Sequence, residues 1–173
     1  LEISLSFGSE PLRRRILECR EHLSERRARQ SLAEGDYLKA LDGFKGLSPQ
    51  VLRSPAQSAA LRRVMEELKS LADNALARKN FVAAGKGYSV LWREYPLAQQ
   101  SGLSLSFSRD DAGEGLKQCR TQLMREGLDQ YRKGNLKEAI AIWQRLLQFD
   151  PDNAEIRKAV DTATEQLKKL QKK

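Results

Sequence analysis

The feature that most constrains the fold is a set of three residues that recurs three times with one spacing: an alanine, an aromatic residue at i+4 and a leucine at i+7. The sets are Ala40, Phe44 and Leu47, then Ala84, Tyr88 and Leu91, then Ala139, Trp143 and Leu146. Residues with this spacing lie on one face of an α-helix. The small alanine lets the preceding helix approach closely, while the two larger side chains fill the layer beyond. The pattern therefore predicts three helices that each pack on the helix before them.

A short turn precedes each of these helices. Gly35 and Gly134 suit a helix end that is followed by a tight turn. Lys79 and Asn80 occupy the same place in the second segment, where asparagine tolerates a left-handed conformation and can cap the next helix. Another amphipathic helix comes before each turn. Its apolar stripe is weakest in the first segment, where it consists of Leu23, Ala28 and Leu32.

The third segment resembles a unit of the tetratricopeptide (TPR) family. The matching residues are Gly127, Tyr131, Gly134, Asn135, Leu136, Ala139, Ile140, Trp143 and Pro151. The second segment matches at Leu68, Leu71, Ala72, Ala75, Ala84, Tyr88 and Pro96, and the first only in its second half. The three alanines are 44 and 55 residues apart, whereas the family repeats every 34 residues, so extra segments intervene. The resemblance implies an all-α fold of antiparallel helix–turn–helix repeats, a TPR-like α-solenoid.

We expect about seven helices. They are placed at residues 11–34, 36–47, 55–78, 80–94, 112–133, 135–149 and 153–171. The expected organisation is an N-terminal extension (1–10), a TPR-like unit with repeats one and two (11–98), a linker loop (99–111), and repeat three with a C-terminal capping helix (112–173). A long connection is expected from Pro96 to Gly113.

The last expected helix carries apolar residues at alternating spacings of three and four, a pattern typical of a helix that covers the end of a repeat array. These residues are Ile156, Val160, Ala163, Leu167 and Leu170.

A second regularity has a period of 100 residues: Ser4 to Phe7 recurs as Ser104 to Phe107, and Cys19 recurs as Cys119. A duplicated larger module and a shared Ser/Leu-rich linker composition both explain it.

The sequence contains few residues of the kinds that catalyse reactions or bind metals and phosphates. His22 is the only histidine, no Gly-rich phosphate loop occurs, and a zinc site needs three or four clustered ligands. We therefore predict no enzyme activity, no cofactor and no metal site. Cys19 and Cys119 are expected to be small buried apolar residues. The neighbouring acids Asp110, Asp111 and Glu114 are expected to act at a helix start, where aspartate commonly caps.

The net charge of +8 favours an acidic partner, whether nucleic acid, an anionic membrane or an acidic protein. Seven arginines fall in the first helix: Arg13, Arg14, Arg15, Arg20, Arg26, Arg27 and Arg29. They are spread around it and interleaved with glutamates, which favours a solvated helix, and no stacking aromatics accompany them. Nucleic acid is therefore the less favoured partner.

No apolar run approaches the roughly 20 residues that span a bilayer. The segment from Leu1 to Phe7 is too short for a signal peptide. Because the chain begins with leucine, we expect a fragment or a processed product, and the bacterial cytoplasm and the cell envelope both stay open as its location.

The TPR resemblance implies a concave groove lined by the first helix of each unit. The candidate groove residues are Lys69, Asp73, Leu76, Met124, Leu128, Tyr131, Arg132 and Asn135. The family's clamp for a C-terminal carboxylate is not predicted, because Asp73 and Leu128 stand where it needs asparagine.

The predicted function is that of a scaffold or adaptor, within a larger bacterial protein or assembly, that binds a peptide or helix of another protein. A homo-oligomer is left open. The alternative is a basic protein that binds nucleic acid or an anionic surface. Arginines gathered on one face would favour the alternative, and an apolar, partly exposed groove would favour the peptide partner.

Overall fold

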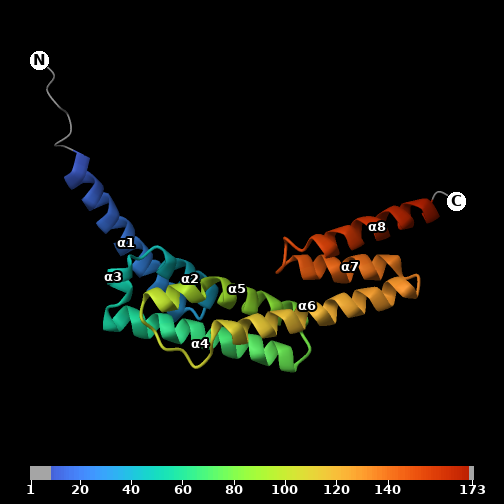
Figure 1. Cartoon of the computed structure of the whole chain (residues 1–173). Helices are drawn as coiled ribbons and strands as arrows, with labels where there is room; N and C mark the ends of the chain where they lie inside the picture. Colours follow the sequence, from blue (N-terminus) through green and yellow to red (C-terminus); the bar gives the residue numbers. More distant parts are fainter. Residues whose placement is uncertain (1–8, 172–173) are drawn as a thin grey trace, which may run out of the picture. The chain divides into compact units, whose positions relative to one another are not determined.

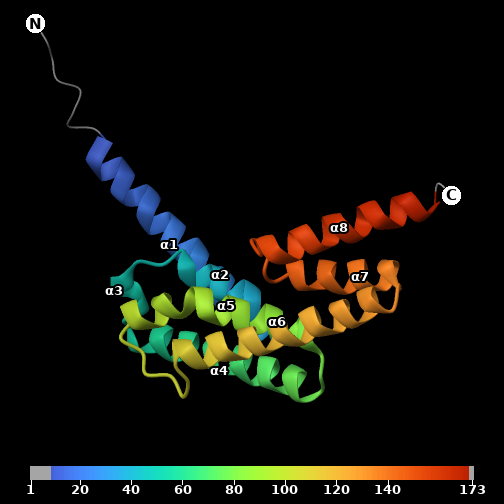
Figure 2. The same cartoon turned by 45° about the vertical axis from the view of Figure 1, so that its right-hand side comes forward.

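The computed structural model describes residues 9–171, and all regular secondary structure in that range is helical. The helices are α1 (Ser9–Ala33), α2 (Tyr37–Lys45), α3 (Pro49–Leu52), α4 (Pro55–Ala77), α5 (Phe81–Gln100), α6 (Arg109–Arg132), α7 (Leu136–Leu147) and α8 (Ala154–Gln171) (Figures 1 and 2). The all-α prediction is therefore confirmed. The short α3 was not predicted, because four residues are too few to show a helical period. The Ser4 to Phe7 segment and most of the expected N-terminal extension lie outside the described residues.

The chain forms two compact units. Of the described residues, the first contains 9–67 together with Pro96–Leu105, and the second contains Leu68–Tyr95 and 106–171. Helix α1 packs on α2 in the first unit, whereas α6 packs on α7 and α7 on α8 in the second. The last three helices run back and forth beside one another (Figures 1 and 2).

All nine residues of the recurring pattern are buried. The three alanines Ala40, Ala84 and Ala139 are fully inaccessible. The aromatic residues and leucines that follow them are at most 6% exposed. Burial of each such large side chain stabilises the fold by roughly 1.5–3 kcal/mol before entropy is counted. The periodicity thus identified the core-facing side of α2, α5 and α7 correctly.

Small residues let paired helices cross closely. A methyl group added to Gly43 of α2 would lie 2.8 Å from the Ala28 Cβ of α1, and one added to Gly87 of α5 would lie 2.9 Å from the Ala72 Cβ of α4. In the third pair, Gly127 of α6 lies directly against the indole of Trp143. Each of these contacts leaves no room for a larger side chain, because protein interiors are close-packed.

The three predicted turns share one backbone conformation. Gly35 and Gly134 have φ angles of 74° and 80°, and Lys79 adopts the same left-handed region at 59°. Asn80 accepts a hydrogen bond from the Ala83 N–H with its side chain, which confirms it as a cap. The left-handed residue of the second turn is thus lysine rather than asparagine.

The connection between α5 and α6 is shorter than predicted. Helix α5 continues through Pro96 to Gln100, and α6 already begins at Arg109. Proline has no N–H to donate to the carbonyl four residues earlier, which belongs to Trp92. The Arg109 Nε donates to that carbonyl at 3.1 Å, which offsets the loss.

Candidate functional site

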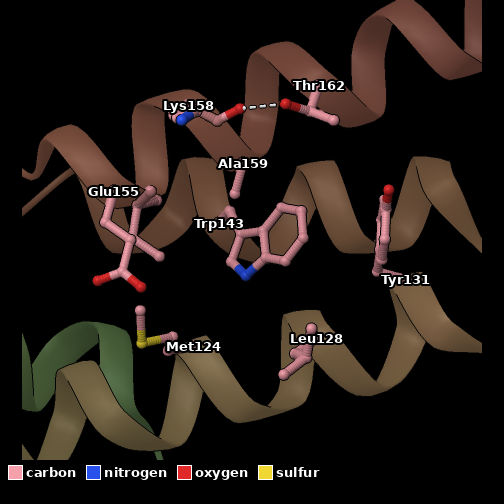
Figure 3. A pocket seen from close by; sticks show the side chains of 9 residues that line it. Met124, Leu128, Tyr131, Trp143, Glu155, Lys158, Ala159 and Thr162 are labelled. Carbon is pink, nitrogen blue, oxygen red and sulfur yellow. Dashed lines mark hydrogen bonds between the residues drawn. The ribbon is translucent and has the colours of Figure 1, made fainter.

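Helices α6, α7 and α8 enclose a groove with a volume of about 470 Å³. Nine residues line it: Met124, Leu128, Tyr131, Trp143, Glu155, Ile156, Lys158, Ala159 and Thr162. The first three belong to α6, Trp143 belongs to α7, and the other five belong to α8. Figure 3 shows the indole of Trp143 between the side chains of α6 and those of α8. The groove is therefore built on three packed helices and not on loops.

Trp143 forms the floor of this groove. Its indole fits because Gly127 has no side chain where α6 crosses α7. The ring of Tyr131 lies 5.9 Å from it, centroid to centroid, at an interplanar angle of 40°. The Trp143 Nε1 is buried and, within the described part of the chain, has no hydrogen-bond partner. Such an unpaired donor costs about 1–3 kcal/mol, so the apolar filling of this layer outweighs that cost.

The walls of the groove are mostly apolar and its rim is polar. Leu128 is 40% exposed although it belongs to the lining, so apolar surface is open to water here. On α8, Ile156 is buried and contributes to the lining. Glu155 and Lys158 give the rim one charge of each sign. The arrangement suits an apolar side chain that enters between polar edges, which is a common design of binding sites.

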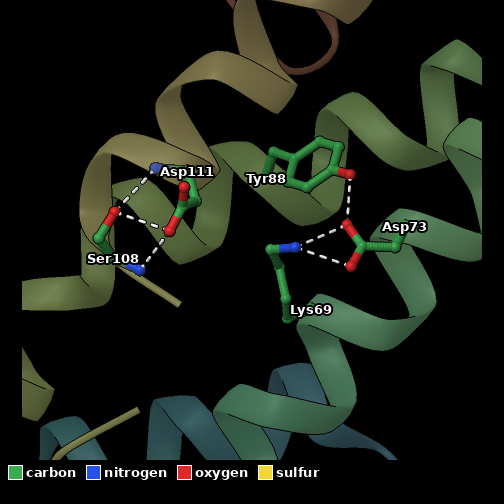
Figure 4. A network of polar contacts seen from close by, with 5 residues as sticks. All are labelled: Lys69, Asp73, Tyr88, Ser108 and Asp111. Atoms are coloured by element: carbon green, nitrogen blue, oxygen red, sulfur yellow. Dashed lines mark hydrogen bonds and ion pairs between the residues drawn. The ribbon is translucent and has the colours of Figure 1, made fainter. Parts of the chain in front are cut away.

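A separate polar network joins α4 to α5 (Figure 4). The ammonium group of Lys69 lies 2.8 and 2.7 Å from the two carboxylate oxygens of Asp73. The Tyr88 hydroxyl donates to the same carboxylate at 2.6 Å. The Lys69 Nζ also lies 5.8 Å from the ring centroids of Tyr88 and Phe107, close enough for cation–π attraction. These side chains thus have partners within the protein.

The pKa of Tyr88 is raised well above its ordinary value. Burial disfavours the charged phenolate, and the Asp73 carboxylate both accepts the hydroxyl hydrogen bond and repels negative charge. The hydroxyl therefore stays protonated and keeps donating to Asp73. This chemistry is typical of a structural tie between helices.

The acidic residues at the start of α6 include a cap. Ser108 accepts from the Asp111 N–H at 3.1 Å, and the Asp111 side chain accepts from the Ser108 N–H at 2.7 Å. These two bonds form a capping box. The pKa of the Asp111 carboxyl is held below its usual value, mainly by the hydrogen bond from the Ser108 backbone N–H and further by the one from the Ser108 hydroxyl. The predicted capping role of Asp111 is confirmed.

The predicted groove residues separate into groups. Met124, Leu128 and Tyr131 do line one groove. The other five do not line it: Lys69, Asp73, Leu76, Arg132 and Asn135. Lys69 and Asp73 belong to the polar network instead, and Leu76 is half-buried on α4. Arg132 ends α6, and Asn135 stands at the N-cap position of α7 with its amide donating to Gln130.

Sequence reasoning missed the contribution of α8. This helix was expected only to cover the end of the repeat array, whereas in the structure it packs on α7 and also supplies five of the nine residues that line the groove. The available signal was the spacing of Glu155, Lys158 and Thr162, which places them on one side of α8.

The two cysteines differ in burial. Cys119 is buried in α6, and burial raises the pKa of its thiol to about 11. Cys19 is exposed on α1, so the prediction of a buried residue is wrong there. Across residues 9–171 there is no group of His, Cys, Asp or Glu side chains that could hold a metal ion. Within the same range, every helix is too short or too polar to cross a membrane.

Comparisons with protein-family models, with curated proteins and with solved structures find no match to this chain. The resemblance to the TPR family therefore stays a prediction that rests on the residues of the three helix pairs.

Proposed function

We propose that the chain is a protein-interaction module whose groove between α6 and α8 binds an apolar side chain from a peptide or helix of a partner protein. The observation that carries this proposal is the open apolar groove over Trp143, into which Leu128 remains partly exposed. Its volume lies within the roughly 300–1,000 Å³ of typical binding pockets.

Two further features support a peptide partner. The groove lies along α6, the first helix of the third TPR-like segment, where the family resemblance implies a binding surface. Aromatic and methionine side chains such as Trp143, Tyr131 and Met124 are also enriched in protein interfaces. Nucleic-acid or anionic-surface binding has weaker support at this site, because among the described lining residues the single cation, Lys158, is accompanied by the anion Glu155.

The test starts from a random peptide library selected against the whole chain. The chain has two tryptophans, so a Trp92→Phe background makes the remaining indole emission report on Trp143 alone. A selected peptide is expected to shift this emission on binding. Leu128→Asp should weaken binding at least tenfold, because it places a charge in the groove that an apolar side chain must enter.

Leu170→Asp is the matched control: it introduces the same charge at a leucine of α8 that is 63% exposed and outside the groove. Circular dichroism checks that both variants fold. Failure to select any peptide, or peptides that bind both variants equally, would overturn the groove proposal. A nanomolar complex with a short oligonucleotide at physiological salt would favour the alternative, since sequence-blind binding is expected only at about 10⁻⁴–10⁻⁶ M.

A further inference from the structure

The first turns of α1 are not covered by any other element within the described residues 9–171. Every residue from 10 to 20 is exposed, and the helix first becomes half-buried at Glu21. From there onward it joins the first unit. The Glu21 side chain accepts from the Ser48 N–H at 3.0 Å, and Ala28 is buried against Gly43. In both views this end of α1 extends away from α2 and α3 (Figures 1 and 2).

An apolar seam runs along this exposed part of α1. Its members are Leu12, Ile16, Cys19 and Leu23, at spacings of four, three and four residues. Leu12, Ile16 and Leu23 are 60%, 44% and 54% exposed, and Cys19 is exposed too. This spacing is that of the a and d positions of a coiled coil, and it confines the four side chains to a stripe about 60° wide. Leu23 was expected to share an apolar stripe with Ala28 and Leu32, and this expectation is wrong, because Leu23 is exposed whereas Ala28 is buried.

The seam faces away from the side of α1 that packs. With about 100° of rotation per residue, Ala28 and Glu21 lie roughly 150–170° from the middle of the seam. Both make contacts inside the first unit. Since the fold covers the opposite side, nothing in the described part of this unit buries the seam.

The charges of α1 are ordered around the seam. In coiled-coil terms Arg13 and Arg20 occupy e positions, while Arg15 and His22 occupy g positions. Each border of the seam thus carries arginine: Arg13 and Arg20 on one side and Arg15 on the other. The acids lie on the far side of the helix, and they are Glu10, Glu18, Glu21 and Glu25. Arginines do occur around the helix as expected, but the glutamates stay away from the seam.

The arrangement of arginines and glutamates around the seam indicates what kind of partner can bind there. A second copy of α1 would place arginines against arginines at the e and g positions in either orientation, and like charges there oppose pairing. A helix that lies in a membrane interface needs a broad apolar face, whereas the stripe on α1 is only about 60° wide. A polyanion would contact the arginines but leave the seam exposed to water. A helix with its own apolar seam and acidic borders satisfies both features.

We propose that residues 12–23 of α1 are a docking surface for one amphipathic helix of a partner protein, whose apolar seam is bordered by aspartates or glutamates. This surface is distinct from the groove over Trp143, and its test does not depend on that groove.

The direct test uses two synthetic helical peptides with identical Leu/Ile seams. One carries glutamate at all e and g positions and the other carries lysine. Binding of each labelled peptide to the whole chain is measured by fluorescence anisotropy, with a reductant present because of Cys19. The glutamate peptide is expected to bind at least tenfold more tightly than the lysine peptide. Its affinity should fall as the salt concentration is raised. Equal binding of both peptides, or binding of neither, would overturn the proposal.

Neighbouring residues on α1 supply a matched pair of variants. Ile16→Asp places a charge in the seam and should abolish binding of the glutamate peptide. Leu17→Asp adds the same charge one residue later, at a leucine that is 57% exposed but lies outside the seam, and should change binding less than threefold. Both residues are exposed, so neither variant disturbs a packed core. Equal losses in the two variants would show that only overall charge matters.

A charge exchange tests the borders themselves. The triple variant Arg13→Glu, Arg15→Glu and Arg20→Glu should prefer the lysine peptide, and a mixture of this variant with the unaltered chain should form a heterodimer in sedimentation velocity. The unaltered chain alone should not dimerise through α1. If the unaltered chain self-associates and Ile16→Asp abolishes this self-association, the seam of α1 binds a second copy of the chain. If the chain binds vesicles that contain phosphatidylserine and Ile16→Asp abolishes this binding, the seam of α1 binds a membrane surface. Either result would overturn the proposal of a partner helix.

Discussion

Arg109 contacts Trp92 in two ways, through a hydrogen bond and through a cation–π contact. Its Nε donates to the Trp92 carbonyl at 3.1 Å, and its guanidinium carbon lies 4.2 Å from the centroid of the indole ring. The first contact supplies a donor to the carbonyl that Pro96 cannot reach. The second is a cation–π contact worth about 0.5–1 kcal/mol at an exposed site. Together they explain how α5 continues as a helix past its proline.

Arg109→Ala should therefore destabilise the protein by about 1–2 kcal/mol, measured by urea unfolding. In a Pro96→Ala background the new N–H can serve the Trp92 carbonyl, so the same substitution should cost roughly half as much. The double-mutant cycle isolates this coupling. Strictly additive effects would mean that the hydrogen bond from Arg109 does not compensate for the proline.

Two glycines of α6 should respond to alanine in opposite ways. At Gly127 the added methyl group would collide with the Trp143 indole, so Gly127→Ala should destabilise by about 1–3 kcal/mol. At Gly113 the methyl group would lie 3.4 Å from the nearest atom of Trp92, an ordinary contact. Gly113→Ala should therefore stabilise by roughly 0.5–1 kcal/mol, because alanine favours helices. Thermal unfolding checks both, and a Gly127→Ala variant as stable as the unaltered chain would contradict the tight crossing of α6 and α7.

The parts of the fold that the sequence predicted are those decided by local spacing. Ala40, Ala84 and Ala139 lie on short helices whose apolar period alone identifies the buried side, and each is fully buried. The length of α5 was missed, because the continuation past Pro96 depends on a side chain from another helix. No pattern within α5 signals that contact.

The groove was predicted in part for a similar reason. Met124, Leu128 and Tyr131 were found because they lie along one side of an expected first helix. The roles of Lys69 and Asp73 could not be read from spacing, since the Tyr88 hydroxyl and the Phe107 ring that accompany them come from other segments. The exposed seam of α1 was overlooked because Leu23 was assigned to a packed stripe, and only tertiary structure shows which side of a helix is covered.

Alkaline pH should destabilise the protein through Tyr88. Its pKa is raised in the folded state, so the folded chain keeps this proton above pH 10, where an unfolded chain begins to release it. The stability from this group is complete below about pH 10 and falls as pH rises further, by at most about 1.4 kcal/mol per pH unit. Tyr88→Phe removes the titrating group. The free energy of unfolding of the unaltered chain should therefore fall faster between pH 9 and 11 than that of the variant, and parallel curves would contradict the raised pKa.

Helix α8 should act as a cap through only some of its apolar residues. Ile156 and Ala163 are buried and Val160 and Leu167 are half-buried, whereas Leu170 is 63% exposed. Ile156→Ala removes a buried side chain beneath the groove and should destabilise by about 2–5 kcal/mol, with a change in Trp143 emission. Leu170→Ala, the control on the same helix, should stay within about 0.5 kcal/mol of the unaltered chain. Removal of the whole helix after Asn153 should expose the layer around Trp143 and lead to partial melting or aggregation. If the truncated chain stayed monomeric with the same melting temperature, α8 would not be needed to cover α7. The groove over Trp143, which α8 lines, would then not be a stable part of the fold.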